Sequence, residues 1–424
     1  MPTGTIYALS SGRPPAAISV IRVSGPAAHA AGAHIAGSLP DARTAVVREL
    51  RHPQSGDLLD EAVVLRFDKP ASSTGEDIVE FQCHGGRAVV DSVLSALASC
   101  DGLREAQPGE FTRRAFENGR IDLTEAEGLA DLIEAETESQ RKAALALAEG
   151  GLRKQIESWQ QTLLGLSAQA ERAIDYDEDD ELIDPSLLEG CAELTAELRY
   201  WLGRPRIEPL KDGVRVVVAG PPNAGKSSLL NAIAGQERAI VTDIPGTTRD
   251  HIEVPLSLGG IPILLTDTAG LRQTEDVVEA IGVSRTEALV EGSDVLLWLG
   301  EPSEAPEHPR LIRIHSKADV REAAPEDSLA VSSVTSEGAA ALLEKIAEHA
   351  KALLPGEDAI ALNRRQAAHL AEAAEAVGYA AAARDPVILA EDLRRARGAF
   401  DRLNGRAGVE DVLDALFGRF CLGK

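Results

Sequence analysis

Gly220-Pro-Pro-Asn-Ala-Gly225-Lys226-Ser227-Ser228 fits the pattern G-x-x-x-x-G-K-[ST] of a phosphate-binding loop. The apolar, β-branched run Val214–Ala219 precedes it and predicts a buried strand, while Leu229–Ala234 follows with a helical period. The two glycines let backbone N–H groups turn toward phosphate oxygens, and the helix adds its positive N-terminal end. We expect Lys226 to reach the β- and γ-phosphates and Ser227 to ligate Mg²⁺. A chance glycine turn that carries a lysine is the alternative, and the flanking strand and helix disfavour it.

Length and charge limit the class of protein. The chain has 424 residues, more than one core usually organises, so we expect two or three domains. Its net charge is 43 − 68 = −25, which disfavours a surface that grips nucleic acid everywhere but leaves room for a local basic face. Candidates for such a face are Arg113, Arg114 and Arg120, or Arg394, Arg395 and Arg397. The four cysteines lack C-x-x-C spacing, and no leader or long apolar run is present, so we expect a cytoplasmic protein.

The texture of the sequence changes along the chain. Residues 1–118 mix short strand-like and helical runs and predict an α+β domain. Residues 119–212 are helical, residues 213–355 alternate strand and helix, and residues 356–424 are helical again. The alternation predicts a mostly parallel sheet with helices on both faces. We therefore interpret the chain as a discontinuous all-α domain interrupted by an inserted α/β domain.

Three local features qualify this outline. Thr124–Glu127 predicts a capping box that begins a long helical stretch reaching to about Ala173. The acidic run Asp175–Glu181 is either a metal site or a solvated linker, and the linker is the more common case. His84-Gly-Gly86 is explained more simply by a turn than by chemistry.

Two signals downstream of the phosphate loop predict metal and phosphate contacts. The segment Ile244–Asp250 offers Thr248 as a second hydroxyl ligand for Mg²⁺. Asp267–Gly270 ends the apolar run that starts at Ile261; there Asp267 can hold the metal through water, and the Gly270 N–H can sense the γ-phosphate.

Two later signals predict the base. Ser316–Asp319 ends a predicted strand, and Asp319 can accept hydrogen bonds from guanine N1–H and the 2-amino group. Adenine offers no such pair, so it would leave a buried carboxylate unsatisfied. Val331–Ser333 fits the last base-contacting loop. Each signal alone is weak, but all five in order, each at a strand end, predict a GTPase.

Two positions depart from the common pattern. Leu271 stands where many GTPases have a glutamine that orients the attacking water, so hydrolysis must recruit another group or be very slow. Ser316 stands where the N-K-x-D motif has asparagine, which braces the loop and contacts the base. The shorter serine is expected to do so only in part, while the choice of guanine depends on Asp319.

The chain resembles the tRNA modification GTPase family known as MnmE or TrmE over nearly its whole length. The matching segments are Thr74–Glu80 with His84–Gly86, Pro108–Phe116, Pro222–Lys226, Gly246–Asp250, Asp267–Arg272 and Phe420–Lys424. The resemblance implies a multidomain fold: an α+β, folate-binding-like N-terminal domain at 1–118, a discontinuous all-α helical domain at 119–212 and 356–424, and an inserted α/β P-loop GTPase domain at 213–355.

The resemblance also implies K⁺-dependent hydrolysis, with the ion at the place of an arginine finger and completed when two GTPase domains meet. Asn223 matches its side-chain ligand; Thr242, Ile244 and Thr247 match the backbone loop that closes over it. Glu279 matches the glutamate that activates water, although its residue type alone suggests only a helix start. The GTP site so predicted comprises Asn223, Ala224, Gly225, Lys226, Ser227, Ser228, Thr242, Asp243, Ile244, Pro245, Gly246, Thr247, Thr248, Asp267, Thr268, Ala269, Gly270, Ser316, Lys317, Ala318, Asp319, Ser332, Ser333 and Val334.

A folate site is implied by matched positions as well. Arg22, Glu80, Arg120 and Lys424 match residues that bind 5-formyltetrahydrofolate. The cations suit the carboxylates of the glutamate tail, and Glu80 suits the N–H edge of the pterin. Cys421 matches a cysteine proposed to be catalytic, and an inert C-terminal thiol is an equal alternative.

Three functions remain open from the sequence. The resemblance implies an enzyme that forms a homodimer and works with an FAD-binding partner, MnmG (GidA), in a heterotetramer or larger complex. That enzyme places a 5-(carboxymethyl)aminomethyl-type group on the wobble uridine of tRNA, with folate as the one-carbon source. The first alternative is a regulatory or ribosome-associated GTPase switch, against which the Phe420–Lys424 tail and the folate-type residues argue. The second is a one-carbon transferase in which the GTPase is only a clamp.

Overall fold

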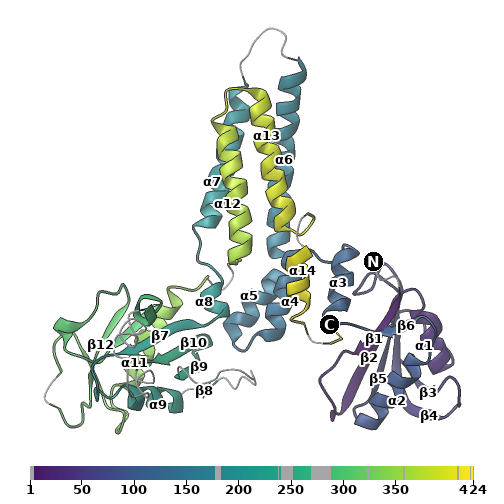
Figure 1. Ribbon diagram of the computed structural model, residues 1–424, viewed down its shortest axis with the longest axis horizontal. Helices are drawn as coiled ribbons and strands as arrows, with labels where there is room; N and C mark the ends of the chain where they lie inside the picture. Colours follow the sequence, from purple (N-terminus) through teal and green to yellow (C-terminus); the bar gives the residue numbers. More distant parts are fainter. Residues whose placement is uncertain are drawn as a thin grey trace, which may run out of the picture. The chain divides into compact units, whose positions relative to one another are not determined.

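The computed structural model describes residues 4–176, 183–236, 238–239, 252–268, 288–321, 324–356, 359–407, 410–420 and 422–423 (Figure 1). The chain divides into two compact units, one of residues Met1–Ala130 with Asp401–Lys424 and one of residues Asp131–Phe400. We call them unit 1 and unit 2. The C-terminal segment therefore returns to the N-terminal unit. No helix among the described residues is both long and apolar enough to cross a membrane.

Unit 1 is built on a six-stranded sheet with the order β3-β4-β5-β2-β1-β6. The strands are β1 (Thr5–Leu9), β2 (Ile18–Ser24), β3 (Val46–Arg51), β4 (Leu58–Phe67), β5 (Ile78–His84) and β6 (Leu103–Glu105). All neighbours are antiparallel except β1 and β6. Alternate residues of β2 and β5, such as Ile21, Val23 and Phe81, are buried in a core with helices α1 (Ala28–Ala36) and α2 (Arg87–Ala98).

The other face of this sheet carries α3 (Glu110–Glu117) at one end. Phe111 of α3 packs with Ile6 and Ala8 of β1. No turn forms at His84–Gly86: β5 ends at His84 and α2 begins at Arg87, with Gly85 and Gly86 as the connection. Gly85 lies so close to Ala16 that a Cβ added there would come within 2.2 Å of the Ala16 carbonyl oxygen. Glycine at 85 is therefore a packing requirement.

Helices distant in sequence meet at the end of unit 1. The hydrophobic cluster joins α4 (Leu123–Glu134) to α14 (Glu410–Phe417) through Leu123, Ala126 and Phe417. The capping box predicted at Thr124 is wrong by two residues. The Asp122 carboxylate accepts from the Glu125 N–H at 2.9 Å, and the Glu125 carboxylate accepts from the Asp122 N–H at 2.7 Å. Asp and Ser/Thr are equivalent cap types, so the pattern alone chose the wrong frame.

The helical stretch predicted from Thr124 to Ala173 is three helices, not one: α4, α5 (Glu138–Ala148) and α6 (Gly151–Tyr176). Thr137 takes an extended backbone and caps α5 in a box with Gln140, while Gly150 has a φ of +78° before α6. Both conformations interrupt helical hydrogen bonding. In unit 2, Trp159 of α6 is almost fully buried, and its ring centroid lies 5.3 Å from that of Trp201 and 6.1 Å from that of Phe400. The other long helices are α7 (Pro185–Leu202), α12 (Arg364–Ala381) and α13 (Pro386–Leu403).

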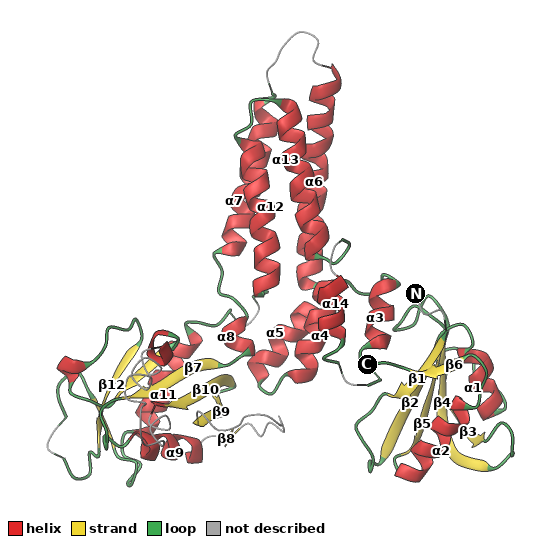
Figure 2. Cartoon of the chain, viewed as in Figure 1, coloured by secondary structure: helices red, strands yellow, loops and turns green. Residues whose placement is uncertain are grey.

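Unit 2 also contains a seven-stranded sheet with the order β13-β12-β11-β7-β10-β9-β8. Figure 2 shows β7, β9 and β10 of this sheet in yellow. Its strands are β7 (Val214–Ala219), β8 (Arg238–Ala239), β9 (Ile252–Leu258), β10 (Ile261–Asp267), β11 (Val295–Trp298), β12 (Leu311–Ser316) and β13 (Leu329–Val331). Pairing is parallel from β13 to β10 and antiparallel at β9 and β8. The helices described in this region, outside residues 240–251 and 269–287, include α8 (Glu208–Lys211), α9 (Lys226–Gln236) and α11 (Ala339–Lys351), with the 3-10 turn η2 (Pro302–Glu304). The predicted α/β fold with a mostly parallel sheet is confirmed.

Candidate guanine-nucleotide site

The phosphate loop connects β7, in the middle of the sheet, to the start of α9. Gly220 and Gly225 have φ values of +147° and +97°, and Asn223 takes the left-handed region at +60°. These angles curl the loop, as the two glycines predicted. The Lys226 ammonium donates to the Gly220 carbonyl at 2.9 Å and to the Pro221 carbonyl at 2.8 Å. Its positive charge is thus held at the loop where phosphate is expected.

Ser227 and Asp267 form a candidate Mg²⁺ site beside this loop, which we call the metal corner. Ser227, at the start of α9, donates from Oγ to Asp267 Oδ2 at 2.6 Å, and Asp267 is only 1% exposed at the end of β10. The adjacent Thr268 donates to the Val218 carbonyl at 3.0 Å and so fixes the strand end to β7. A hydroxyl and a carboxylate in contact form the oxygen donor set that Mg²⁺ prefers, so these residues fit the ion.

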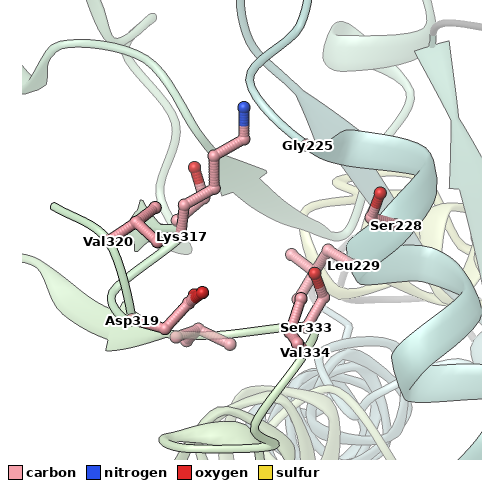
Figure 3. A pocket seen from close by; sticks show the side chains of 10 residues that line it. Gly225, Ser228, Leu229, Lys317, Asp319, Val320, Ser333 and Val334 are labelled. Carbon is pink, nitrogen blue, oxygen red and sulfur yellow. The ribbon is translucent and has the colours of Figure 1, made fainter.

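A pocket of about 250 Å³ lies between α9 and the ends of β12 and β13 (Figure 3). Its lining residues are Gly225, Ser228, Leu229, Ser316, Lys317, Asp319, Val320, Val331, Ser333 and Val334. Asp319 Oδ1 accepts a hydrogen bond from Ser332 Oγ at 2.7 Å, and Ser332 Oγ accepts from the Val334 N–H at 3.2 Å. The loop after β13 therefore orients the carboxylate assigned to guanine. Leu229 and Val320 were not predicted, because apolar residues of a base pocket carry no motif of their own.

The loop that begins at Ser316 and carries Asp319 is hydrogen-bonded to the phosphate loop. Ser316 Oγ donates to the Ala224 carbonyl at 2.7 Å, in a bond that is buried. Lys317 Nζ donates to the Asn223 carbonyl at 3.0 Å, and Lys317 has a φ of +60°. Ser316 thus braces the phosphate loop by itself. From the sequence, the shorter serine was expected to do so only in part.

Several predicted residues lie outside the part of the chain that the structure describes. For the nucleotide and cation these are Thr242, Asp243, Ile244, Pro245, Gly246, Thr247, Thr248, Ala269, Gly270 and Glu279, together with Leu271; for the folate site they are Cys421 and Lys424. Their assignments stay predictions.

In unit 1 the structure joins two of the predicted folate residues. Arg22 and Glu80 are register partners on β2 and β5, and Arg22 Nε donates to Glu80 Oε1 at 2.8 Å. The Arg22 guanidinium also lies over the Phe111 ring, 5.6 Å from its centroid. Arg120 is exposed, and its side chain packs beside Gly75, where an added Cβ would lie 3.3 Å from Arg120 Cγ.

Arg114, one of the candidates for a local basic face, does not lie on an exposed surface. That side chain is 7% exposed and donates to Glu76 at 3.0 Å and to Glu110 at 3.0 Å, so it is a structural residue. Arg113 pairs with Glu117 and Asp414. On α13, Arg394 pairs with Glu391, and Arg395 pairs with Asp392. A run of arginines in a sequence does not reveal the carboxylates that face it.

Family models decide the relationship of this chain to known proteins. The model of the MnmE helical domain matches residues 123–421, and that of the GTP-binding protein TrmE N-terminus matches residues 5–120. The chain belongs to the MnmE family of tRNA modification GTPases. It is therefore a GTP hydrolase of tRNA modification; the order of its nucleotide signals predicted the GTPase, and the family resemblance implied the tRNA modification.

Curated MnmE proteins match along the full chain. The tRNA modification GTPase MnmE of Novosphingobium aromaticivorans is 49% identical over 100% of both chains. That of Rhizorhabdus wittichii is 52% identical over 99% of this chain and 96% of its own, and that of Erythrobacter litoralis is 50% identical over 99% and 100%. Among solved structures, the G domain of the T. maritima FeoB iron transporter is 27% identical over 32% of this chain and 98% of its own, with a TM-score of 0.25.

Proposed function

We propose that this MnmE-family chain is a K⁺-dependent GTPase that acts on tRNA with an FAD-binding partner of the MnmG (GidA) type. Together they install a 5-(carboxymethyl)aminomethyl-type group on the wobble uridine, with a folate-derived one-carbon unit. The observation that carries the GTPase part is the bonded unit of phosphate loop, metal corner and base pocket, in which Ser227 contacts Asp267 and Ser332 orients Asp319. The partner and the tRNA product follow from family membership.

Different residues of the chain have different proposed roles in GTP hydrolysis. Lys226 supplies positive charge at the β- and γ-phosphates, and Ser227 with Asp267 offers oxygen ligands for Mg²⁺. Asn223 is exposed at the turn of the loop in a left-handed conformation, which leaves its side chain accessible as a K⁺ ligand. Bound K⁺ would stabilise the charge that develops between the β- and γ-phosphates. Thr242, Ile244 and Thr247 are proposed to complete its coordination, and Glu279 is proposed to activate the attacking water.

The folate site is proposed around Arg22, Glu80, Arg120 and Lys424, with Cys421 near the chemistry. The Arg22–Glu80 pair has side chains that are 23% and 15% exposed, so both charges remain accessible to a ligand on that sheet face. An incoming carboxylate can bind the guanidinium, and the pterin N–H edge can bind the carboxylate.

We propose a homodimer as the working state. Support comes from unit 1, where Ile18 and Val47 are 59% and 53% exposed on the sheet. Register places Ile18 opposite His84 and Val47 opposite Val63, which itself pairs with Gln82, so these positions share one face. Exposed apolar residues gathered on one face are typical of a protein contact.

The deciding experiment compares the GTP hydrolysis rate in K⁺ with that in Na⁺ at equal ionic strength. We expect K⁺ to raise kcat on the order of 10²- to 10³-fold, the scale of one well-placed electrostatic contact in a transition state. Asn223→Ala should remove most of this gain, whereas Asn231→Ala, at an exposed position of α9, should keep it. A rate indifferent to the ion contradicts the K⁺ assignment. For the tRNA assignment, mass analysis of tRNA after gene deletion should show loss of the wobble modification, and an unchanged uridine contradicts it.

A further inference from the structure

The Ser316 hydroxyl has one proton, and two acceptors could use it: the Ala224 carbonyl oxygen and N7 of the base. It ends β12, is 6% exposed and lines the base pocket with Asp319. Its Oγ lies 2.7 Å from the Ala224 carbonyl oxygen. A carbonyl oxygen only accepts hydrogen bonds, so the serine proton lies on this contact and points at the phosphate loop.

The remaining edge of guanine needs donors. N7 and O6 of the base are acceptors only, whereas its N1–H and 2-amino group are the donors that suit Asp319. A serine hydroxyl has one proton, and here that proton is committed to Ala224. An asparagine amide has two N–H donors, so it can brace the loop and bind N7 at once.

Two other polar side chains near the pocket form hydrogen bonds within these loops. The Lys317 ammonium donates to the Asn223 carbonyl at 3.0 Å, toward the phosphate loop. Ser332 gives its proton to Asp319 Oδ1 at 2.7 Å and accepts from backbone N–H groups. These bonds fix the two loops and the Asp319 carboxylate relative to one another.

We propose that Ser316 is a positioning residue that fixes the phosphate loop through Ala224 and leaves guanine N7 unread. Guanine is then recognised at its N1–H and 2-amino group by Asp319, and nucleotides of 7-deazaguanine fit this pocket as well as those of guanine. This inference rests on the proposed function, because it takes the pocket as the guanine site.

Three substitutions separate bracing from base reading. Ser316→Ala removes the brace and leaves the Ala224 carbonyl without its partner, so GDP and 7-deaza-GDP should both bind about 3- to 10-fold more weakly, with an unchanged ratio. Ser316→Thr keeps the hydroxyl and should restore both affinities. Ser316→Asn adds a second donor and should favour GDP over 7-deaza-GDP by about 3- to 10-fold. A role in folding alone would not move this ratio.

The measurement is displacement of a fluorescent GDP from the full-length protein by GDP, 7-deaza-GDP and ADP in the presence of Mg²⁺. Ser303→Ala, at an exposed serine outside the pocket lining, is the control. Equal binding of GDP and 7-deaza-GDP by the unmodified chain, with ADP excluded, is the expected result. A clear preference for GDP over 7-deaza-GDP overturns the inference and leaves the GTPase assignment intact. Binding of ADP as strong as that of GDP overturns the guanine site itself.

Discussion

Cys83 and Cys191 show how burial sets the chemistry of single residues. Burial raises the pKa of the Cys83 thiol to about 12, and the charge of Asp60 adds to the effect. Burial alone raises the pKa of Cys191 to about 11. Because the thiolate is the reactive form, both side chains are inert thiols at neutral pH. Of the four cysteines, Cys421 is the one to which a chemical role is assigned by the family resemblance.

Alkylation tests this prediction. We expect iodoacetamide at about pH 8 to leave Cys83 and Cys191 of the native protein unmodified, because few thiolates form and both sulfurs are buried. After unfolding in urea both should react fully, and mass spectrometry of the peptides measures each site. Fast modification of Cys83 in the native protein contradicts the prediction. The same peptides report whether Cys421 is a reactive thiol.

At the scale of elements, α3 is fixed to the sheet of unit 1 by ion pairs with little exposure. Glu110 accepts from Arg104 at 2.8 Å and from Arg114 at 3.0 Å, and Arg114 continues to Glu76. Burial raises the pKa of Glu110, but hydrogen bonds from Arg104, the Gln107 N–H and Arg114 outweigh it, so the pKa lies below its ordinary value. The charged form is therefore the one that the folded state favours.

This network predicts a pH-dependent contribution to stability. A carboxylate with a lowered folded pKa stabilises fully above its unfolded pKa, near 4.5, and loses the contribution as pH falls through the folded value. Glu110→Gln should cost about 2 kcal/mol of unfolding free energy at pH 7, because the buried Arg114 and the partly exposed Arg104 each lose a counter-charge. The difference from the unmodified protein should shrink below about pH 4.5.

Urea unfolding at pH 7 and near pH 3.5 measures both effects. Glu117→Gln is the matched control on the same helix, since its pair with Arg113 is more exposed and should cost at most about 1 kcal/mol. A Glu110→Gln penalty that is equal at both pH values would show that packing, not charge, carries the contribution.

The whole molecule carries a charge of −25, and four of the six arginines that suggested a basic face, Arg113, Arg114, Arg394 and Arg395, are paired with carboxylates within their own units. A polyanion such as tRNA gains little from releasing counterions at such a surface. If the proposed FAD-binding partner takes part, most phosphate contacts should therefore come from it. Unit 1 and unit 2 are therefore expected to contribute few contacts to tRNA phosphates. The catalytic residues proposed in them do not depend on this charge argument.

A binding measurement follows at this scale. At about 0.15 M salt we expect the chain alone to bind tRNA with a Kd weaker than about 10⁻⁶ M, and the MnmG-type partner to tighten binding in a salt-dependent manner. Filter binding or fluorescence anisotropy with the chain, the partner and both together gives the three values. Submicromolar binding by the chain alone contradicts the prediction.

The sequence by itself determined local strands and helices and the class of reaction, GTP hydrolysis. Strand β7 lies at the predicted residues, and the phosphate loop stands between a strand and a helix as its motif required. Periodicity and motifs work here because they depend on residues within a few positions of each other. They do less well where equivalent residue types compete, as with Asp122 and Thr124.

Only the tertiary structure decided which side chains meet. The bond between Ser316 and Ala224 spans 92 residues, and Arg113 with Asp414 spans 301. Arg114 is a buried structural residue, not a surface one, because Glu76 and Glu110 face it. Helix α14 likewise packs on α4, which lies far from it in the sequence. Such contacts come from the closure of long loops around shared cores, and no short window of sequence contains both partners.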